Sequence, residues 1–244
     1  MYHGKSLLAV IPARGGSKGL PRKNVLDCAG RPLIAWTIEA ARRAASVDVV
    51  LVSTDSEEVA EASREAGADV PFVRPDALAS DAASMLDVIS HSWENHRTRS
   101  GTPYDYVIVL QPTSPLRGAG LISDAITHYF HTRRSDQDTL ASVIEAKGKY
   151  GWLLDRRPES PYVRFCFDVS TNPQRQQLPD YYLPNGAIFI VKGTTIAKGL
   201  YRDTTLPFVM SEDDSIDIDS AEDLQVAAAA LLRRKGFHPS RRTV

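Results

Sequence analysis

The sequence predicts an α/β protein built on a doubly wound, mostly parallel sheet. Short apolar runs of the length expected for buried strands occur at Leu7–Ile11, Val49–Val52 and Tyr106–Leu110. Each run is followed by a turn and then by a stretch with helical spacing of its apolar residues. This alternation favours parallel strands joined by right-handed crossovers. Ligands of such sheets bind beyond the carboxyl ends of the strands, so the residues that leave these strands are the first candidates for a site.

The expected helices have recognisable ends. Pro32 opens a helix that runs to about Ala45, and Asp55 or Ser56 caps a second helix, Glu57–Ala66, which Gly67 closes. For Asp55 we prefer this capping role to a catalytic one. We expect further helices at Ser84–His96, Gly120–Phe130, Thr195–Lys198 and Ala221–Arg234, the last capped by Ser220, further strands at Val70–Val73, Leu140–Ile144, Gly186–Val191 and Phe208–Met210, and a loop at Asp76–Asp81.

One long segment interrupts the alternation of strands and helices. Residues 147–182 are polar, aromatic and proline-bearing, without helical periodicity, and are too many for a structureless connection. The segment therefore predicts a protruding β arm. We assign residues 1–140 and 183–234 to the α/β domain, 141–182 to the arm, and 235–244 to a basic, flexible tail.

Composition narrows the classes of function. The chain has 244 residues and a formal net charge of −1, so no general attraction to nucleic acid or to a membrane is expected. No apolar run is long enough for a membrane span or a signal peptide. Cys28 and Cys166 form no disulfide framework, which fits a cytoplasmic location, and the six histidines lack the spacing of zinc ligands.

The loop after the first strand collects glycine and positive charge. Glycines allow a close approach of the backbone to a ligand, and exposed amides together with cations suit a polyphosphate. The order of residues is neither that of a Walker A loop nor that of the dinucleotide-binding fingerprint. The alternative is a solvated basic turn. The residues concerned are Gly15, Gly16 and Gly19 and the cations Arg14, Lys18, Arg22 and Lys23.

Near the other end of the chain, Asp217 and Asp219 alternate with Ile216 and Ile218. In an extended segment both carboxylates point to one face, which is costly unless a cation joins them. Hard oxygen ligands select Mg²⁺, which also takes phosphate oxygens. The alternative is a solvated acidic turn in which Asp219 helps to start the final helix.

Three further side chains are candidates. Arg74 follows a predicted strand and could pair with a base or a phosphate, or form a surface ion pair. Gln111 leaves the Tyr106–Leu110 strand with both a donor and an acceptor, and could bind a polar substrate or cap the turn. Arg175 is unremarkable by spacing alone. Ser53 lacks the context of a serine nucleophile.

Several blocks of the sequence, in order, resemble the acylneuraminate cytidylyltransferases. The resemblance extends over about 7–232, and the Kdo-specific branch is similar only in Ile-Pro-Ala-Arg. The blocks are Ile11–Asn24, Val52–Asp55, Arg74–Pro75 with Leu78–Asp81, Leu110–Arg117, Arg175–Pro179 with Asn185–Phe189, and Ser215–Asp219.

The resemblance implies a Rossmann-like sheet of the nucleotidyltransferase type and a role for each matching residue. It implies that CTP is bound by Arg14, Gly16, Ser17, Lys18, Lys23, Asn24 and Arg74, the sugar by Gln111 and Arg175, and Mg²⁺ by Asp217 and Asp219, with Arg14, Lys23 and Arg175 needed for activity. It also implies a homodimer whose arms cover the partner's sugar pocket.

The implied reaction transfers CMP from CTP to the anomeric hydroxyl of a nine-carbon 2-keto sugar acid. Three alternatives stay open: a cytidylyltransferase for Kdo or a phosphonate, a CTP-binding module without catalysis, and a purely structural dimer. The family often has adjacent bulky aromatics where this chain has Gly199-Leu200-Tyr201, so the sequence leaves the sugar open among sialic, legionaminic and pseudaminic acids.

Overall fold

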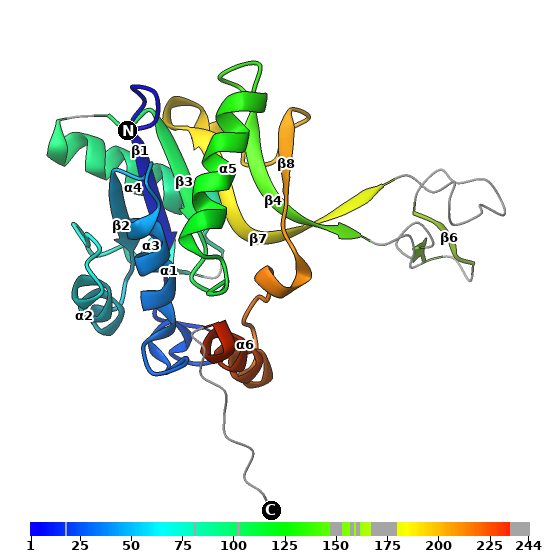
Figure 1. Ribbon diagram of the computed structural model, residues 1–244, viewed down its shortest axis with the longest axis horizontal. Coiled ribbons are helices and arrows are strands. Elements are labelled where there is room, and N and C mark those ends of the chain that lie inside the picture. The colour runs from blue at the N-terminus through cyan, green and yellow to red at the C-terminus, as the bar shows by residue number, and fades with distance from the viewer. Residues whose placement is uncertain are drawn as a thin grey trace, which may run out of the picture.

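The computed structural model describes residues 1–17, 19–80, 82–101, 103–146, 153–156, 159, 162–166 and 180–234. Its centre is a six-stranded sheet in the order β2-β1-β3-β7-β4-β8 (Figure 1). Strand β7 runs antiparallel to β3 and β4, and the other neighbouring strands pair in parallel. The predicted mostly parallel sheet is therefore confirmed. The strands are β1 (Leu7–Pro12), β2 (Val49–Ser53), β3 (Tyr106–Leu110), β4 (Thr139–Ala146), β7 (Tyr181–Lys192) and β8 (Thr205–Val209).

The central strands are apolar throughout because both of their faces are covered. In β1, Leu7, Ala9 and Ile11 join one core cluster, while Leu8 and Val10 join the cluster on the opposite face. Strand β3 alternates in the same way. A strand that is buried on both sides loses the polar alternation of a half-exposed strand, which is why its run of apolar residues was readable in the sequence.

Helices cover both faces of the sheet. The cluster on one face includes side chains of α1 (Leu33–Arg43), α2 (Glu57–Glu65) and α5 (Ala119–Thr132). The cluster on the other face includes side chains of α4 (Met85–Ser100) and of the 3-10 helix η4 (Gly193–Lys198). Ser84, the first residue of the predicted helix, caps α4. Gly101 ends the helix in the left-handed conformation, with a φ of 70°. None of the helices in the described part of the chain is both long and apolar enough to cross a membrane.

Two predicted elements near β2 were wrong. Residues 70–73 form no strand but only an isolated bridge between Thr54 and Val73. Pro71 lacks the N–H that a ladder requires, so the segment cannot continue as a strand. The expected loop at 76–81 contains the short helix α3 (Asp76–Ala79), which follows Pro75 with its helix-compatible φ of −58°. Asp81 lies outside the described residues.

The described part of the predicted arm has β structure. Strands β4 and β7 pair from Leu140–Ile190 out to Ala146–Tyr181 and continue beyond the sheet as a two-stranded ribbon (Figure 1). Further out, β5 (Leu154–Asp155) pairs antiparallel with β6 (Arg164–Phe165). Strand β7 therefore begins earlier than the predicted strand 186–191.

The last described elements are the 3-10 helix η5 (Glu212–Asp214) and helix α6 (Ala221–Arg234). As predicted, Ser220 caps α6, because its Oγ accepts a hydrogen bond from the Asp223 N–H at 3.2 Å. Ile218, Ala227 and Leu231 pack with Leu33 at the start of α1 in a third cluster. This packing brings the acidic segment near the end of the chain back to the loop that follows β1.

Candidate active site

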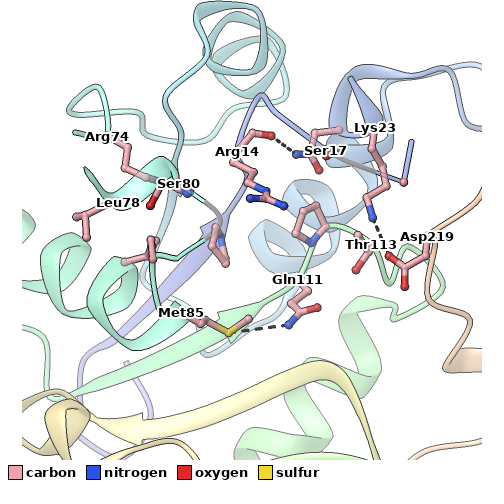
Figure 2. A pocket seen from close by; sticks show the side chains of 16 residues that line it. Arg14, Ser17, Lys23, Arg74, Leu78, Ser80, Met85, Gln111, Thr113 and Asp219 are labelled. Carbon is pink, nitrogen blue, oxygen red and sulfur yellow. Dashed lines mark hydrogen bonds and ion pairs between the residues drawn. The ribbon is translucent and has the colours of Figure 1, made fainter. Parts of the chain in front are cut away.

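Two adjoining cavities open at the carboxyl edge of the sheet, with volumes of about 420 Å³ and 710 Å³, and we call them the first and second cavity. Met85 and Gln111 line both of them. In Figure 2, the side chain of Arg14 lies between Arg74 on one side of the first cavity and Lys23 on the other. The first cavity is lined by Pro12, Arg14, Ser17, Gly19, Lys23, Asn24, Arg74, Leu78, Ser80, Ala83, Met85, Val88, Gln111, Pro112, Thr113 and Asp219.

The loop after β1 is held in place by hydrogen bonds that leave its cations at the first cavity. The Gly15 N–H donates to Asp55 Oδ1 at 3.0 Å, and Asn24 Nδ2 donates to the Arg14 carbonyl at 2.9 Å. Ser56, and not Asp55, caps α2. Asp55 is thus a support of the loop that sequence reasoning missed.

The described cations of the loop do not all line the first cavity. Arg22 has a left-handed φ of 56°, and its Nε donates to Glu58 Oε2 at 3.1 Å, outside the first cavity. The next residue, Lys23, begins the 3-10 helix η1 (Lys23–Val25) and lines the cavity. Lys18 lies outside the described residues. Of the described cations of this loop, Arg14 and Lys23 therefore line the first cavity.

Lys23 joins the two ends of the chain. Its Nζ donates to the Ile218 carbonyl at 2.7 Å and to Asp219 Oδ1 at 3.0 Å (Figure 2). The backbones also approach closely, because a Cβ added to Gly19 would lie 2.8 Å from the Asp219 carbonyl oxygen. The basic loop and the acidic segment therefore face one site, as the sequence hypothesis requires.

Asp217 and Asp219 border different cavities, with Asp219 on the first and Asp217 on the second. Between them Ile218 is fully buried, and its N–H donates to the Thr113 carbonyl at 2.9 Å. Loss of solvent raises the pKa of the Asp217 carboxyl, and the charge of Asp219 raises it further, while Thr113 and Lys23 oppose the change. The charges of the two carboxylates thus oppose each other, and a bound cation would relieve this repulsion.

The donor set of this pair fits Mg²⁺. Among the described residues there is no group of three or more His, Cys, Asp or Glu side chains that could hold a metal. Mg²⁺ commonly uses one or two protein carboxylates and completes its shell with phosphate oxygens and water. Asp217 and Asp219 are therefore two oxygen donors of the kind that Mg²⁺ takes together with phosphate oxygens.

Arg74 is buried, with 4% of its surface exposed, so the alternative of a surface ion pair was wrong. Its Nε donates to Ser53 Oγ at 3.1 Å, and Nη2 donates to the Ser53 carbonyl. Burial lowers the pKa of its guanidinium, and Arg14 lowers it further while Asp55 opposes the change. Arg74 lines the first cavity across from the basic loop, and a buried guanidinium there favours an anionic or polar ligand.

Gln111 is held from behind by a fully buried arginine. Arg117 Nη1 donates to the carbonyls of Gln111 at 3.2 Å and Ala187 at 2.5 Å, and Nη2 donates to Thr37 Oγ1 at 2.9 Å. Burial lowers the pKa of Arg117 to about 9. This guanidinium ties the turn after β3 to β7 and α1, and so fixes the wall shared by the two cavities.

Most of the candidate residues from the sequence are brought together. Gly16 is exposed and borders neither cavity, and Arg175 lies outside the described residues. Sequence reasoning missed the apolar lining from Leu78, Met85 and Val88, because α3 was expected to be a loop and Met85 stands at the predicted start of a helix. The candidates at the two cavities are Arg14, Ser17, Lys23, Asn24, Arg74, Gln111, Asp217 and Asp219.

The fold and this edge of the sheet define an α/β protein of the nucleotidyltransferase type. The family model described as cytidylyltransferase matches residues 8–150, and the chain belongs to that family. Among curated relatives, an N-acylneuraminate cytidylyltransferase of Escherichia coli is 34% identical over 91% of this chain. The chain spans about half, 51%, of the length of that relative.

Other relatives match over nearly their whole length. A CMP-N,N′-diacetyllegionaminic acid synthase of Legionella pneumophila is 34% identical, over 89% of this chain and 92% of the relative. A pseudaminic acid cytidylyltransferase of Campylobacter jejuni is 32% identical, over 90% of this chain and 94% of the relative. A solved CMP:2-keto-3-deoxy-manno-octonic acid synthetase complexed with CTP has a TM-score of 0.68 at 18% identity, covers 94% of this chain and 100% of its own, and supports the fold alone.

Proposed function

We propose that the protein transfers CMP from CTP to the anomeric hydroxyl of a nine-carbon 2-keto sugar acid and releases pyrophosphate. The observation that carries the proposal is the junction of the two cavities. Gln111 lines both, and the Asp217–Asp219 pair places one carboxylate on each. A nucleotide in the first cavity and an acid in the second would meet at this junction. The names of the relatives agree with this pair of substrates.

The first cavity offers a separate partner for each part of CTP. Arg14, Lys23 and, in this proposal, Lys18 bind the triphosphate. Asn24 is 4% exposed, and its Oδ1 has no hydrogen-bond partner among the described residues, so it can accept a bond from the cytidine. Arg74 binds the same part of the nucleotide, and the apolar wall at Leu78 suits the face of the base.

We propose Mg²⁺ as the cofactor, held by Asp217 and Asp219. When bound, the ion neutralises and orients phosphate oxygens. In its absence Lys23 neutralises Asp219, and its ammonium group can turn to the phosphates when they arrive. The chain thus keeps a positive charge at this point in both states.

In the transfer, the anomeric hydroxyl oxygen forms a bond to the α-phosphorus. The bond from that phosphorus to the β-phosphate oxygen breaks, pyrophosphate leaves, and the hydroxyl proton passes to solvent. Such a displacement needs alignment and charge neutralisation more than a protein nucleophile. Gln111 orients the acid, and Arg14 and Lys23 stabilise the negative charge that gathers on the departing pyrophosphate. Arg175 is proposed to act on the sugar side.

We also propose that the protein is a cytoplasmic homodimer joined through its arm. The ribbon of β4 and β7 leaves the body of the protein, and large apolar side chains are exposed on the described arm residues. Such a group of side chains suits burial against a second copy of the chain. They are Leu153, Leu154, Tyr162, Val163 and Tyr182. Light scattering coupled to gel filtration tests the mass directly, and a monomeric mass at micromolar concentration would contradict the dimer.

The central experiment measures pyrophosphate release with CTP, Mg²⁺ and a panel of acids. The panel contains sialic, legionaminic and pseudaminic acids, Kdo and a simple phosphonate, each with and without EDTA. We expect release with nine-carbon acids and loss of release when CTP is replaced by UTP. Release with Kdo or the phosphonate alone would support the alternative acceptors. Binding of CTP without release for any acid would leave only a nucleotide-binding module.

A further inference from the structure

The second cavity has a strongly apolar wall. Of its lining residues, Leu200 is buried with 7% exposure, and the ring of Phe189 packs edge-on against Tyr201 with ring centroids 5.4 Å apart. These residues border the second cavity and not the first. The apolar members of the wall are Met85, Leu86, Ile144, Leu183, Pro184, Phe189 and Leu200, together with the ring of Tyr201.

The polar residues of the same wall are largely committed to other protein groups. Asn185 Oδ1 accepts hydrogen bonds from Ser142 Oγ at 2.5 Å and the Ala187 N–H at 3.2 Å. Asn185 Nδ2 donates to Ser215 Oγ at 2.8 Å and contacts Met210 Sδ at 3.4 Å. The amide of Asn185 has two donors and two acceptor sites, so it has little left for a ligand.

The two serines of the wall are committed in the same way. Ser215 Oγ donates to the Ser211 carbonyl at 2.6 Å while it accepts the bond from Asn185. Ser84 Oγ donates to Asp87 Oδ2 at 2.8 Å and accepts the Asp87 N–H at 3.1 Å, because it caps α4. Neither hydroxyl has a proton to spare.

The uncommitted polar capacity lies where the two cavities meet. Among the described residues, the side chain of Gln111 has one weak contact, from Nε2 to Met85 Sδ at 3.9 Å, and Asp217 lines the same cavity. Tyr201, whose ring packs on Phe189, lines the second cavity and not the first. The second cavity is therefore polar at the reacting end of an acid and apolar beyond it.

We propose that the acceptor is a deoxygenated, acyl-substituted sugar acid and not one with a polyhydroxylated side chain. This inference rests on the proposed function. A side chain with several hydroxyls would lose water on entering this cavity and find few partners among the described residues, whereas a deoxygenated, acylated side chain replaces hydroxyls by methyl-bearing groups that bury apolar surface on this wall and leaves only its amide N–H and C=O to be paired. An apolar wall of this kind changes the ratio of kcat/KM between two competing acids by about 10-fold or more.

The test compares two acids of equal carbon number in the pyrophosphate assay. N-acetylneuraminic acid has a hydroxylated side chain, and N,N′-diacetyllegionaminic acid has a second acylamido group and a terminal methyl. We expect kcat/KM to be about 10-fold or more higher for the second acid. Equal values, or a preference for N-acetylneuraminic acid, would overturn the inference while leaving the proposed function intact. If neither acid gives pyrophosphate, both the inference and the proposed function are contradicted.

Variants of the apolar wall test whether it causes the preference between the two acids. Leu183→Asn and Leu86→Asn each add a free amide at a half-buried position in the second cavity. Both should narrow the ratio of kcat/KM between the two acids several-fold. Val226→Asn is the matched control, because Val226 is 53% exposed on α6, away from the cavity. A wild-type ratio in both cavity variants, with binding of CTP retained, would show that this wall does not choose the acceptor.

Discussion

The Lys23 ammonium group lies 3.0 Å from Asp219 Oδ1, which joins residues that are 196 positions apart in the chain. The contact places a cation of the loop after β1 directly beside one of the paired carboxylates. A polyphosphate with its Mg²⁺ would meet both charges at once. In the proposed reaction this pairing lies where nucleotide and acceptor meet, which makes Asp219 the most informative position to change.

Asp219→Ala should lower kcat by about 10²-fold or more, because the variant loses a carboxylate that the proposed Mg²⁺ needs at the phosphates. The measurement is pyrophosphate release at saturating CTP and Mg²⁺, with circular dichroism to confirm the fold. Asp213→Ala is the matched control, since Asp213 is an exposed carboxylate of η5 outside both cavities. Near-normal turnover in Asp219→Ala would contradict the metal assignment.

Arg14 and Arg22 provide a comparison within one loop. Arg14 lines the first cavity, whereas Arg22 is turned toward Glu58. Arg14→Ala should reduce kcat/KM for CTP on the order of 10²-fold, because positive charge is lost where, in the proposed reaction, pyrophosphate leaves. Arg22→Ala removes the same charge and should keep kcat/KM within about threefold, the scale of a surface ion pair. Similar losses in both variants would mean that general charge, and not position, attracts CTP.

The sequence predicted the sheet well because its central strands are buried on both faces. A run such as Leu7–Ile11 admits few alternatives once it is followed by glycine and then a helix. The alternation around Asp217 and Asp219 was also readable, since Ile218 between them is fully buried, while their role as Mg²⁺ ligands stays a prediction. In each case a local pattern reflects burial directly.

Long-range support of the site was not readable. Asp55 could cap a helix by its position, yet it binds Gly15, because the ends of β1 and β2 lie side by side. Arg117 lies in a turn with two prolines nearby, and only the packing of β7 and α1 around it shows why it is buried. These contacts form between segments that are distant in the sequence, so no periodic pattern of residues predicts them.

Gly19→Ala should disturb the junction of the two chain ends. The added Cβ would meet the Asp219 carbonyl oxygen at 2.8 Å, which is backbone and has little freedom to move. We expect a loss of about 1–3 kcal/mol in the free energy of unfolding, the range of an overpacked site. In Gly16→Ala, in the same loop, the added Cβ meets no atom of the described residues within 4 Å, so the variant should leave that free energy within about 0.5 kcal/mol. Equal thermal unfolding curves for the two variants would show that the loop moves to accommodate the added Cβ at little cost.

Asp136, which lies near the amino end of β3 and away from the site, should make the stability of the protein depend on pH. Hydrogen bonds from Lys192, Arg133 and Tyr106 hold the pKa of its carboxyl at about 2. Because this pKa is lower in the folded than in the unfolded chain, the carboxylate stabilises the fold above about pH 4, and the effect fades as the pH falls toward 2. The side chain is 47% exposed, so solvent screening reduces the expected contribution to about 1 kcal/mol.

Asp136→Asn should therefore lower the free energy of unfolding by about 1 kcal/mol at pH 7, as measured by urea titration, and by progressively less below about pH 4. The matched control is Asp124→Asn, an exposed position on α5, which should change the free energy by less than about 0.5 kcal/mol at either pH. The kinetics of pyrophosphate release should be unchanged in Asp136→Asn, because Asp136 borders neither cavity. A loss of stability that is the same at pH 7 and at pH 3 would mean that the side chain acts through packing and not through its charge.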